Sequence, residues 1–346
     1  MIKKGRGISA IMHPTGFKGG GDPDQALLKL KPDGTVDLLT GVTDYGQGGK
    51  TVLRQFAAEE LGIDIDMISL HNKGTDNVTW STDTAASRVT FIAGNAVIKA
   101  AQDFKRNLKR FAAGILNVDA DDLEIDGVKI YKKDNPEIAT TYADIGAAST
   151  WGGGFVVGVG AYLVPPAAPV DPITGAMDFC AAMAYAVCVA DVEVDTETGY
   201  VDVVNMYTGY EIGTAVNPLL CEGQFDGGAV MGMGMAIMEN LYPKYPDDAG
   251  WASSYTDYII PTTMDCPEMK NTVVEIKDPR GPYGAKGMGE MSSNPQAPAI
   301  ANAIYDAIGV RMDSLPITAE KVLAALGQHR TENCVQKMSL RGKIKT

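Results

Sequence analysis

Residues 284–291 read Gly-Ala-Lys-Gly-Met-Gly-Glu-Met and precede a long apolar helix pattern. This stretch contains three glycines and a single carboxylate, that of Glu290. So many missing side chains are needed only where a backbone closely approaches a ligand or another segment. The pattern therefore predicts a tight loop with Glu290 at its end. Two roles are open for Glu290, the N-cap of the following helix or a general base. Burial of the Glu290 side chain among apolar residues would raise its pKa and make it a better proton acceptor.

Composition restricts the class of protein. The 346 residues, of which 45% are hydrophobic, suffice for one large domain or two medium ones. A net charge of −13 disfavours nucleic acid and anionic membrane surfaces as partners. No run approaches the ~20 apolar residues of a membrane span, and the N-terminus lacks the apolar core of a signal peptide. We therefore expect a cytoplasmic protein.

The cysteines and histidines show no spacing typical of a metal site. No C-x-x-C pair is present, so we expect neither an iron–sulfur cluster nor a zinc site within this chain. Scattered cysteines fit reduced, buried thiols. The residues concerned are Cys180, Cys188, Cys221, Cys266, Cys334, His13, His71 and His329.

Local patterns predict an alternation of strands and helices. Predicted strands cover residues 26–30, 35–40, 68–72, 128–131, 184–194, 200–207 and 273–276. Predicted helices cover residues 51–61, 89–111, a stretch from Pro218 onward, 298–308 and 316–326.

Two other segments are predicted to be irregular. Residues 1–24 are interpreted as an extended entry and a loop, and residues 149–178 as a long crossing segment. The chain therefore divides into subdomains at 1–150 and 151–326. Residues 327–346 form a basic tail, for which a frayed end is the default and a docking arm the alternative.

Residues 43–51, Thr-Asp-Tyr-Gly-Gln-Gly-Gly-Lys-Thr, look at first like a phosphate loop. The standard motif needs glycine at position 44, where Asp44 would oppose a phosphate, so a P-loop ATPase is excluded. A glycine-rich loop that enters a helix still offers N–H groups to an electron-rich ligand, and the amide of Gln47 can donate and accept. A tight strand-to-helix turn without a ligand is the alternative.

Residues 82–90, Thr-Asp-Thr-Ala-Ala-Ser-Arg-Val-Thr, gather hydroxyls and small residues at a predicted helix start. Helix capping alone would explain them. Alternatively, these hydroxyls and backbone amides bind a cofactor rich in heteroatoms.

Taken in order, these segments resemble the C-terminal half of the molybdopterin-binding subunit of the xanthine dehydrogenase/aldehyde oxidase family of molybdenum hydroxylases. As a separate chain of this size, the protein is most similar to the medium molybdopterin subunit of nicotinate dehydrogenases. The matching stretches are Tyr-Gly-Gln-Gly at 45–48, Thr-Ala-Ala-Ser at 84–87, Asn-Pro at 217–218 with Glu-Gly-Gln at 222–224 and Gly-Gly at 227–228, the loop 284–290, Pro-Ala-Ile at 298–300, and residues 315–321.

The resemblance implies an α+β fold with two molybdopterin-binding subdomains. It implies a molybdenum cofactor whose pyranopterin, in the cytosine dinucleotide form, holds the metal without a direct protein ligand. It also implies that Glu290 is the catalytic base. The implied cofactor contacts are Gly46, Gln47, Gly48, Thr84, Ala85, Ala86, Ser87, Arg88, Thr90, Gly287, Met288 and Gly289.

The implied reaction is hydroxylation of a nicotinate-like N-heteroaromatic compound with oxygen derived from water. A purine such as xanthine, an aldehyde or an aryl-CoA thioester are alternative substrates. A second molybdopterin subunit, a [2Fe–2S] subunit and an FAD subunit would complete a heteromeric complex. A non-catalytic assembly or cofactor-insertion protein of the same fold is the rival, and the presence of Glu290 disfavours it.

Two departures from the family concern the cofactor and the substrate. Met231 stands where many xanthine dehydrogenases have a glutamine that contacts the cofactor, and Met-Ser-Ser at 291–293 stands where many relatives have proline. Arg280 and Lys286 are candidates to bind a substrate carboxylate, with a surface or loop-bracing role as the alternative.

Overall fold

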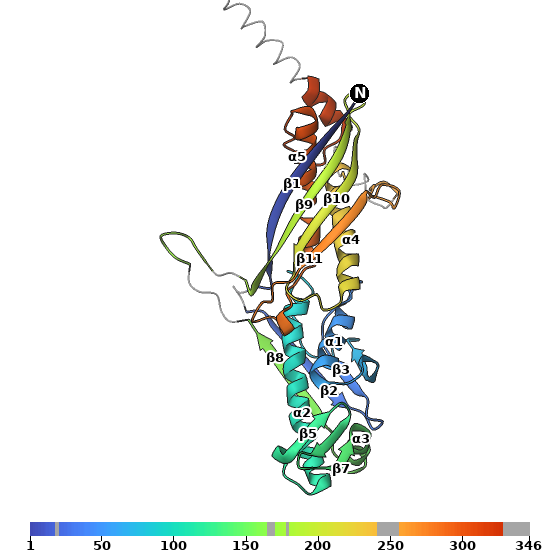
Figure 1. Cartoon of the computed structure of the whole chain (residues 1–346), viewed down its shortest axis with the longest axis vertical. Coiled ribbons are helices and arrows are strands. Elements are labelled where there is room, and N and C mark those ends of the chain that lie inside the picture. Colours follow the sequence, from blue (N-terminus) through green and yellow to red (C-terminus); the bar gives the residue numbers. More distant parts are fainter. Residues whose placement is uncertain (18–20, 165–169, 178–179, 241–255, 328–346) are drawn as a thin grey trace, which may run out of the picture.

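The computed structural model describes residues 1–17, 21–164, 170–177, 180–240 and 256–327. In this part the chain forms an elongated molecule with three sheets arranged along its long axis (Figure 1). Helices accompany each sheet, so the predicted α+β fold class is confirmed. No helix among these residues has the length and apolar character needed to cross a membrane.

The first lobe is built on a four-stranded sheet in the order β4-β3-β2-β8, against which α1 and α2 pack. Inward residues alternate along β2, and fully buried Leu28, Leu38, Phe56 and Phe104 centre the core. β2 and β3 form the predicted hairpin. The elements are β2 (Pro23–Leu30), β3 (Val36–Leu39), α1 (Gly49–Leu61), η1 (Ile65–Met67), β4 (Ile68–His71), η2 (Val89–Ala93), α2 (Gly94–Leu116) and β8 (Val157–Leu163).

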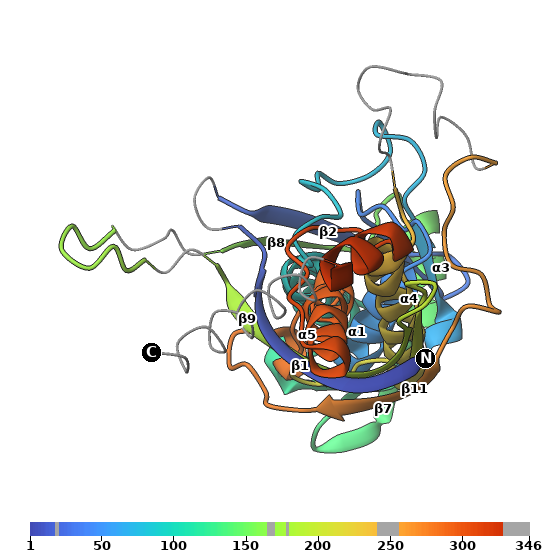
Figure 2. The same ribbon diagram turned by 90° about the horizontal axis from the view of Figure 1, so that it is seen from above.

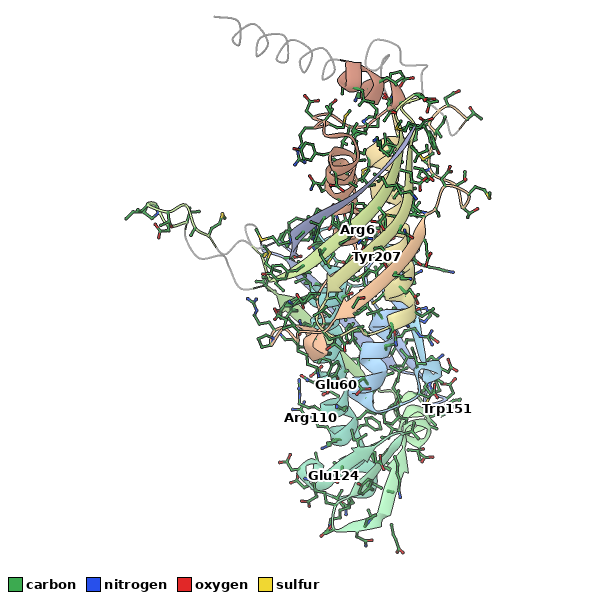
Figure 3. All side chains as sticks on the ribbon, turned by 45° about the horizontal axis from the view of Figure 1, so that its top comes forward. Arg6, Glu60, Arg110, Glu124, Trp151 and Tyr207 are labelled. Atoms are coloured by element: carbon green, nitrogen blue, oxygen red, sulfur yellow. The ribbon has the colours of Figure 1, made fainter. Side chains whose placement is uncertain are left out.

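A small three-stranded sheet and α3 extend this lobe at the end of the molecule far from α5 (Figure 1). α3 begins with a capping box between Thr141 and Asp144. Glu124 and Trp151 lie at this end, and Arg6 and Tyr207 lie on the sheet of the other lobe (Figure 3). The elements are η3 (Ala120–Asp122), β5 (Leu123–Asp126), β6 (Lys129–Lys132), β7 (Asn135–Thr141) and α3 (Tyr142–Trp151).

The second lobe is built on a four-stranded sheet in the order β1-β9-β10-β11, with α4 and α5 on one face. Seen from above, β1 curves around α5 (Figure 2). The predicted hairpin, the helix that starts at Pro218 and the helix that ends at Ile308 are confirmed. The elements are β1 (Ile2–Thr15), β9 (Ala182–Asp195), β10 (Val201–Glu211), α4 (Pro218–Ile237), β11 (Glu268–Val274), η4 (Pro282–Gly284), η5 (Glu290–Ser293) and α5 (Gln296–Ile308). A final helical stretch covers residues 319–327.

Two strands contradict the predicted irregular segments, and both carry a Gly-x-Gly pair. β1 forms within residues 1–24, and β8 forms within residues 149–178. A Cβ added at Gly7 would lie 2.1 Å from the carbonyl oxygen of Ala299 on α5. A Cβ added at Gly160 would lie 2.2 Å from the carbonyl oxygen of Ala96 on α2. These glycines therefore let a helix rest directly on the strand, where the sequence pattern suggested a loop.

Strand pairing crosses residue 150 in both directions. β8 follows that residue but pairs with β2, and β1 precedes it but pairs with β9. The division into 1–150 and 151–326 therefore stays a prediction, and the lobes are defined here by their sheets. Residues 328–346, with most of the predicted tail, His329 and Cys334, lie outside the described residues.

Candidate active site

A cavity of about 560 Å³ lies where the two lobes meet. Three of its walls are the loops that the sequence singled out, and the fourth is α4. The residues around it are Tyr45, Gln47, Gly49, Val52, Thr84, Ala85, Ser87, Arg88, Val89, Thr90, Ile212, Thr214, Val216, Asn217, Leu220, Cys221, Gln224, Gly227, Gly228, Met231, Lys286, Gly287, Met288, Gly289, Glu290, Ser292 and Ser293.

The loop that ends at Glu290 is fastened at its base to the segment that follows β10. The N–H of Lys286 donates to the carbonyl of Ile212 at 2.9 Å, and the N–H of Thr214 donates to the carbonyl of Gly284 at 3.1 Å. The Lys286 side chain is buried, and its Nζ lies 2.7 Å from Oε2 of Glu211. Lys286 is therefore a loop brace and not a free cation for a substrate carboxylate.

Glu290 is held by a hydroxyl at the lobe interface. Ser87 Oγ donates to Glu290 Oε2 at 3.0 Å and accepts from the Glu290 N–H at 3.1 Å. His13 Nε2 lies 3.7 Å from the same carboxylate oxygen. The Glu290 side chain is 52% exposed, so the residues of this chain do not enclose it among apolar groups. The N-cap alternative is also wrong, because Gly289 and Pro295 occupy the caps of η5 and α5.

The segment that carries Ser87 has an unusual backbone. Ala86 and Ser87 adopt φ values of 48° and 51°, the left-handed region that non-glycine residues rarely enter. Gly16 donates its N–H to the carbonyl of Ala86 at 2.9 Å. A Cβ added at Gly287 would lie 1.7 Å from the carbonyl oxygen of Ser87, so the two loops touch backbone to backbone. The glycine at 287 is thus required by packing between the loops.

Hydroxyls in residues 82–90 do not cap a helix. Thr84 Oγ1 donates to the carbonyl of Thr43 at 2.7 Å, and Thr82 Oγ1 donates to the carbonyl of Pro23 at 3.0 Å. The cap of η2 is Arg88, whose side chain makes no cap bond. Capping alone therefore does not explain this cluster.

Arg88 is buried in an ion cluster behind the cavity wall. Its Nε lies 2.5 Å from Oδ1 of Asp22, and its Nη1 lies 2.9 Å from Oδ2 of Asp24. All three side chains are fully buried. Burial raises the pKa of Asp24 despite the opposing charge of Arg88. The guanidinium therefore serves the fold and has no exposed group to offer a ligand.

The loop before α1 uses its carboxylate internally. Asp44 accepts hydrogen bonds from the N–H groups of Lys50 at 2.8 Å, Gly46 at 3.0 Å and Gly48 at 3.4 Å. Burial raises the pKa of Asp44, but these bonds outweigh burial and hold it below its ordinary value of 3.8. A carboxylate thus fills the position where a phosphate loop would bind its ligand. Gln47 faces the cavity, with its Oε1 accepting from the N–H of Tyr45 at 2.9 Å.

The fourth wall, α4, contributes residues that are not among the predicted cofactor contacts, although the resemblance raised Met231. The cavity is lined by the N-cap Asn217 and, from the first four turns of the helix, by Leu220, Cys221, Gln224 and Met231. The available signal was a helix studded with glycine. Of the predicted cofactor contacts, Gly46, Gly48 and Ala86 do not line the cavity, although each lies within a lining loop. Arg280 is absent from the lining and lies 3.5 Å from Asp278.

Comparison with known proteins assigns the family. Residues 1–267 match the family described as a molybdopterin cofactor-binding domain. The chain is 33% identical over 329 residues to the 6-hydroxypseudooxynicotine dehydrogenase complex subunit gamma of Paenarthrobacter nicotinovorans, covering 93% of this chain and 39% of that protein. The chain belongs to the molybdenum hydroxylase family. The resemblance found in the sequence is therefore confirmed.

Two further relatives extend the comparison. A probable hypoxanthine oxidase of Escherichia coli (strain K12) is 31% identical, with 93% of this chain and 32% of that protein covered. Quinoline 2-oxidoreductase from Pseudomonas putida 86 has a similar structure, with a TM-score of 0.78, 25% identity, and coverage of 94% of this chain and 42% of that chain. The chain spans less than half the length of each of these relatives.

The cavity suits the cofactor of a molybdenum hydroxylase in size and in chemistry. Its volume lies within the roughly 300–1,000 Å³ typical of ligand pockets. Three amide side chains on its walls can donate toward a polar heterocycle. Gln47 and Asn217 each keep one amide hydrogen beyond the bonds they make within the chain, and Gln224 also lines the cavity. The Thr84 hydroxyl donates to the Thr43 carbonyl but can still accept. Among the described residues, no group of three or more His, Cys, Asp or Glu side chains could hold a metal ion.

Proposed function

We propose that this chain forms part of the active site of a molybdenum hydroxylase that hydroxylates a nicotinate-like N-heteroaromatic compound, with oxygen from water and Glu290 as general base. The observation that carries the proposal is the Glu290 carboxylate, held at the wall of a 560 Å³ cavity by Ser87. The match to the molybdopterin cofactor-binding domain supports the cofactor.

The cofactor would be a molybdenum pyranopterin, in the cytosine dinucleotide form, bound by the loops around the cavity. Gln47, Thr84 and the backbone at Ser87 would hold it from the first lobe, and residues 287–289 and Gln224 from the second. When bound, this group supplies the two-electron acceptor of the hydroxylation. Arg88 would act indirectly, because its buried ion cluster fixes the backbone beside Ser87.

Glu290 would accept the proton that the water-derived nucleophile loses. Both recorded side-chain contacts, from Ser87 and His13, reach Oε2, which leaves Oε1 to take up the proton. Fixing one oxygen holds the carboxylate in a single orientation. A base that is already oriented avoids losing rotational freedom during the reaction.

The walls of the cavity favour a flat, partly apolar substrate. Val52, Val216, Leu220, Met231 and Met288 provide the apolar surface, beside the polar groups named above. The names of two relatives, a hypoxanthine oxidase and a quinoline oxidoreductase, refer to nitrogen-containing ring compounds. These features support an N-heteroaromatic substrate, with a purine as the second candidate.

The exposed face of α4 supports a heteromeric complex. Leu219, Gly223, Gly227, Met231 and Met235 follow one another at four-residue spacing and are all exposed. An exposed helix face is normally polar. A Cβ at Gly223 or Gly227 would meet nothing within 4 Å, so packing inside this chain does not explain these helix-weakening glycines.

This apolar row continues from the cavity wall, since Gly227 and Met231 belong to both. We propose that a second molybdopterin polypeptide, corresponding to the part of the relatives that this chain does not span, covers the row and closes the cavity. A [2Fe–2S] subunit and an FAD subunit would carry electrons onward, within a cytoplasmic complex.

The decisive experiment replaces Glu290 by glutamine in the complete complex. Glu290→Gln should retain molybdenum and pterin at wild-type content and lower turnover at least ~100-fold, because the proton acceptor is lost. Metal analysis, pterin fluorescence and steady-state kinetics measure these quantities. Glu137→Gln, an exposed position on β7, is the matched control and should retain full turnover.

The outcomes separate the candidates. Near-normal turnover in Glu290→Gln would remove Glu290 from the role of base. A purified wild-type complex without molybdenum and pterin would instead favour the assembly or cofactor-insertion protein.

A further inference from the structure

We propose that Ser87 is a positioning residue whose hydroxyl fixes both the backbone and the carboxylate of Glu290. A catalytic effect of Ser87 depends on the proposed role of Glu290 as base. The two hydrogen bonds between Ser87 and Glu290 do not depend on that role, because they join residues of the described chain, 203 positions apart in sequence.

The directions of the two hydrogen bonds follow from the groups involved. The Glu290 N–H can only donate, so Ser87 Oγ accepts from it at 3.1 Å. The ionised carboxylate can only accept, so the single hydroxyl proton points to Oε2 at 3.0 Å. One hydroxyl therefore bridges the main chain and the side chain of the same residue. This bridge restricts the rotation that would otherwise swing the carboxylate away from the cavity.

The backbone around Ser87 is held in a costly conformation that serves this contact. Ala86 and Ser87 both lie in the left-handed region, and such residues persist only where surrounding contacts hold them. The Ala86 carbonyl accepts from the Gly16 N–H, and the next residue, Arg88, is anchored in its buried ion cluster. Gly287 packs against the Ser87 carbonyl. Ser87 is thus fixed from three sides, and its hydroxyl projects toward Glu290.

Other hydroxyls of the segment make different contacts. Thr82 and Thr84 donate to backbone carbonyls of the first lobe, at Pro23 and Thr43. Ser293 donates to the Glu290 carbonyl at 3.1 Å and does not reach its carboxylate. His13 lies farther from Oε2 than a hydrogen bond, at 3.7 Å. Among the described contacts, Ser87 is therefore the group that orients the carboxylate.

The test compares Ser87→Ala and Ser87→Gly in the holoenzyme complex. Both variants remove the hydroxyl, but only glycine also relieves the left-handed backbone. Positioning predicts that both lower kcat about ten-fold with KM within about three-fold, at unchanged molybdenum and pterin content. Ser149→Ala, which removes a buried hydroxyl bonded to the Gly146 carbonyl in α3, is the control and should leave kcat unchanged.

A readout independent of turnover is the exchange of the Glu290 amide hydrogen. Mass spectrometry of the peptide covering 287–293 should show faster exchange in both Ser87 variants and no change in Ser149→Ala. Glu290→Gln keeps the bond from its N–H to Ser87, so its exchange should stay close to wild type. Unchanged exchange in both Ser87 variants would overturn the inference.

A double-mutant cycle separates this inference from the proposed function. If Ser87 acts through Glu290, adding Ser87→Ala to Glu290→Gln should change turnover by less than about two-fold. An equal loss in both backgrounds, or a loss of cofactor content, would show that Ser87 acts on the cofactor directly and would overturn positioning. Full turnover in Glu290→Gln alone would instead overturn the proposed function, while the exchange result would still decide the geometry.

Discussion

Two glycine-rich loops frame the cavity, and each carries one carboxylate, but the carboxylates are used differently. Asp44 accepts three backbone N–H groups at the start of α1 and stabilises its own loop. Glu290 is half exposed and is held by one hydroxyl from the other lobe. The loop at 43–49 is thus held by its own carboxylate and by Thr84 of the same lobe, whereas the end of the loop at 284–290 is held by Ser87 of the other lobe.

This difference shows how to distinguish a structural carboxylate from a functional one in similar sequence surroundings. The decisive property is how much of the hydrogen-bonding capacity of the carboxylate the fold already uses. Asp44 has both oxygens engaged by backbone donors, so little remains for a ligand. Glu290 keeps one oxygen outside the recorded contacts. The comparison can be tested by perturbing each loop separately.

The largest loss of stability is expected from Gly287→Ala. The added Cβ would lie 1.7 Å from the Ser87 carbonyl oxygen, a backbone atom that cannot move aside cheaply. Overpacking of this kind should lower the free energy of unfolding by at least about 2 kcal/mol. It should also displace Glu290 and reduce turnover. Urea unfolding of the chain and kinetics of the complex measure the two effects.

Gly46→Ala in the other loop provides the comparison for Gly287→Ala. Its Cβ would meet nothing within 4 Å, although its φ of 117° disfavours alanine. Its stability loss should therefore be the smaller of the two. A larger loss at Gly46 than at Gly287 would contradict the view that contact between the lobes shapes the loop at 284–290.

A smaller loss of stability is expected from Asp44→Ala, which removes the acceptor for one N–H group in the first turn of α1 and two in the loop before it. Loss of a carboxylate in such a position should lower the free energy of unfolding by about 1–2 kcal/mol. Because the pKa of Asp44 is lowered in the folded chain, its contribution is present at neutral pH. The contribution falls as the pH approaches 3.8 and is lost below the lowered native pKa.

Urea midpoints measured between neutral and acidic pH test this dependence. Wild type and Asp44→Ala should differ most at neutral pH and converge as the pH falls below 3.8. Asp76 is an exposed position in the loop after β4, and the urea midpoint of Asp76→Ala should differ from that of wild type by the same amount at every pH. A constant difference at every pH would mean that the charge of Asp44 is not what stabilises the helix start.

Local sequence patterns were sufficient for the parts of the fold whose contacts are local. The hairpins at 26–40 and 184–207 and the helices beginning near Thr51 and Pro218 follow from alternation, turn residues and caps. The three loops of the site were also indicated by glycine and hydroxyl content. Each of these features depends on neighbours within about a dozen residues, which a sequence displays directly.

Features that depend on distant contacts were not accessible in this way. The strands β1 and β8 lie within segments predicted to be irregular, because the helices that pack on their glycines lie far away in sequence. The buried ion cluster of Arg88 requires Asp22 and Asp24, more than 60 positions earlier. The partner of Glu290 likewise comes from 203 positions away. The family resemblance identified Glu290, but only the fold shows Ser87 beside it.

The smallest effect on stability is expected from Glu290→Gln, the substitution with the greatest expected effect on turnover. The glutamine amide oxygen can still accept from Ser87, and the Glu290 N–H bond to Ser87 is a backbone contact that the substitution keeps. The side chain is 52% exposed, so little desolvation is involved. The free energy of unfolding should therefore change by no more than about 0.5 kcal/mol. Urea unfolding at neutral pH measures it beside Asp44→Ala, and a loss as large as that of Asp44→Ala would mean that both carboxylates mainly support the fold.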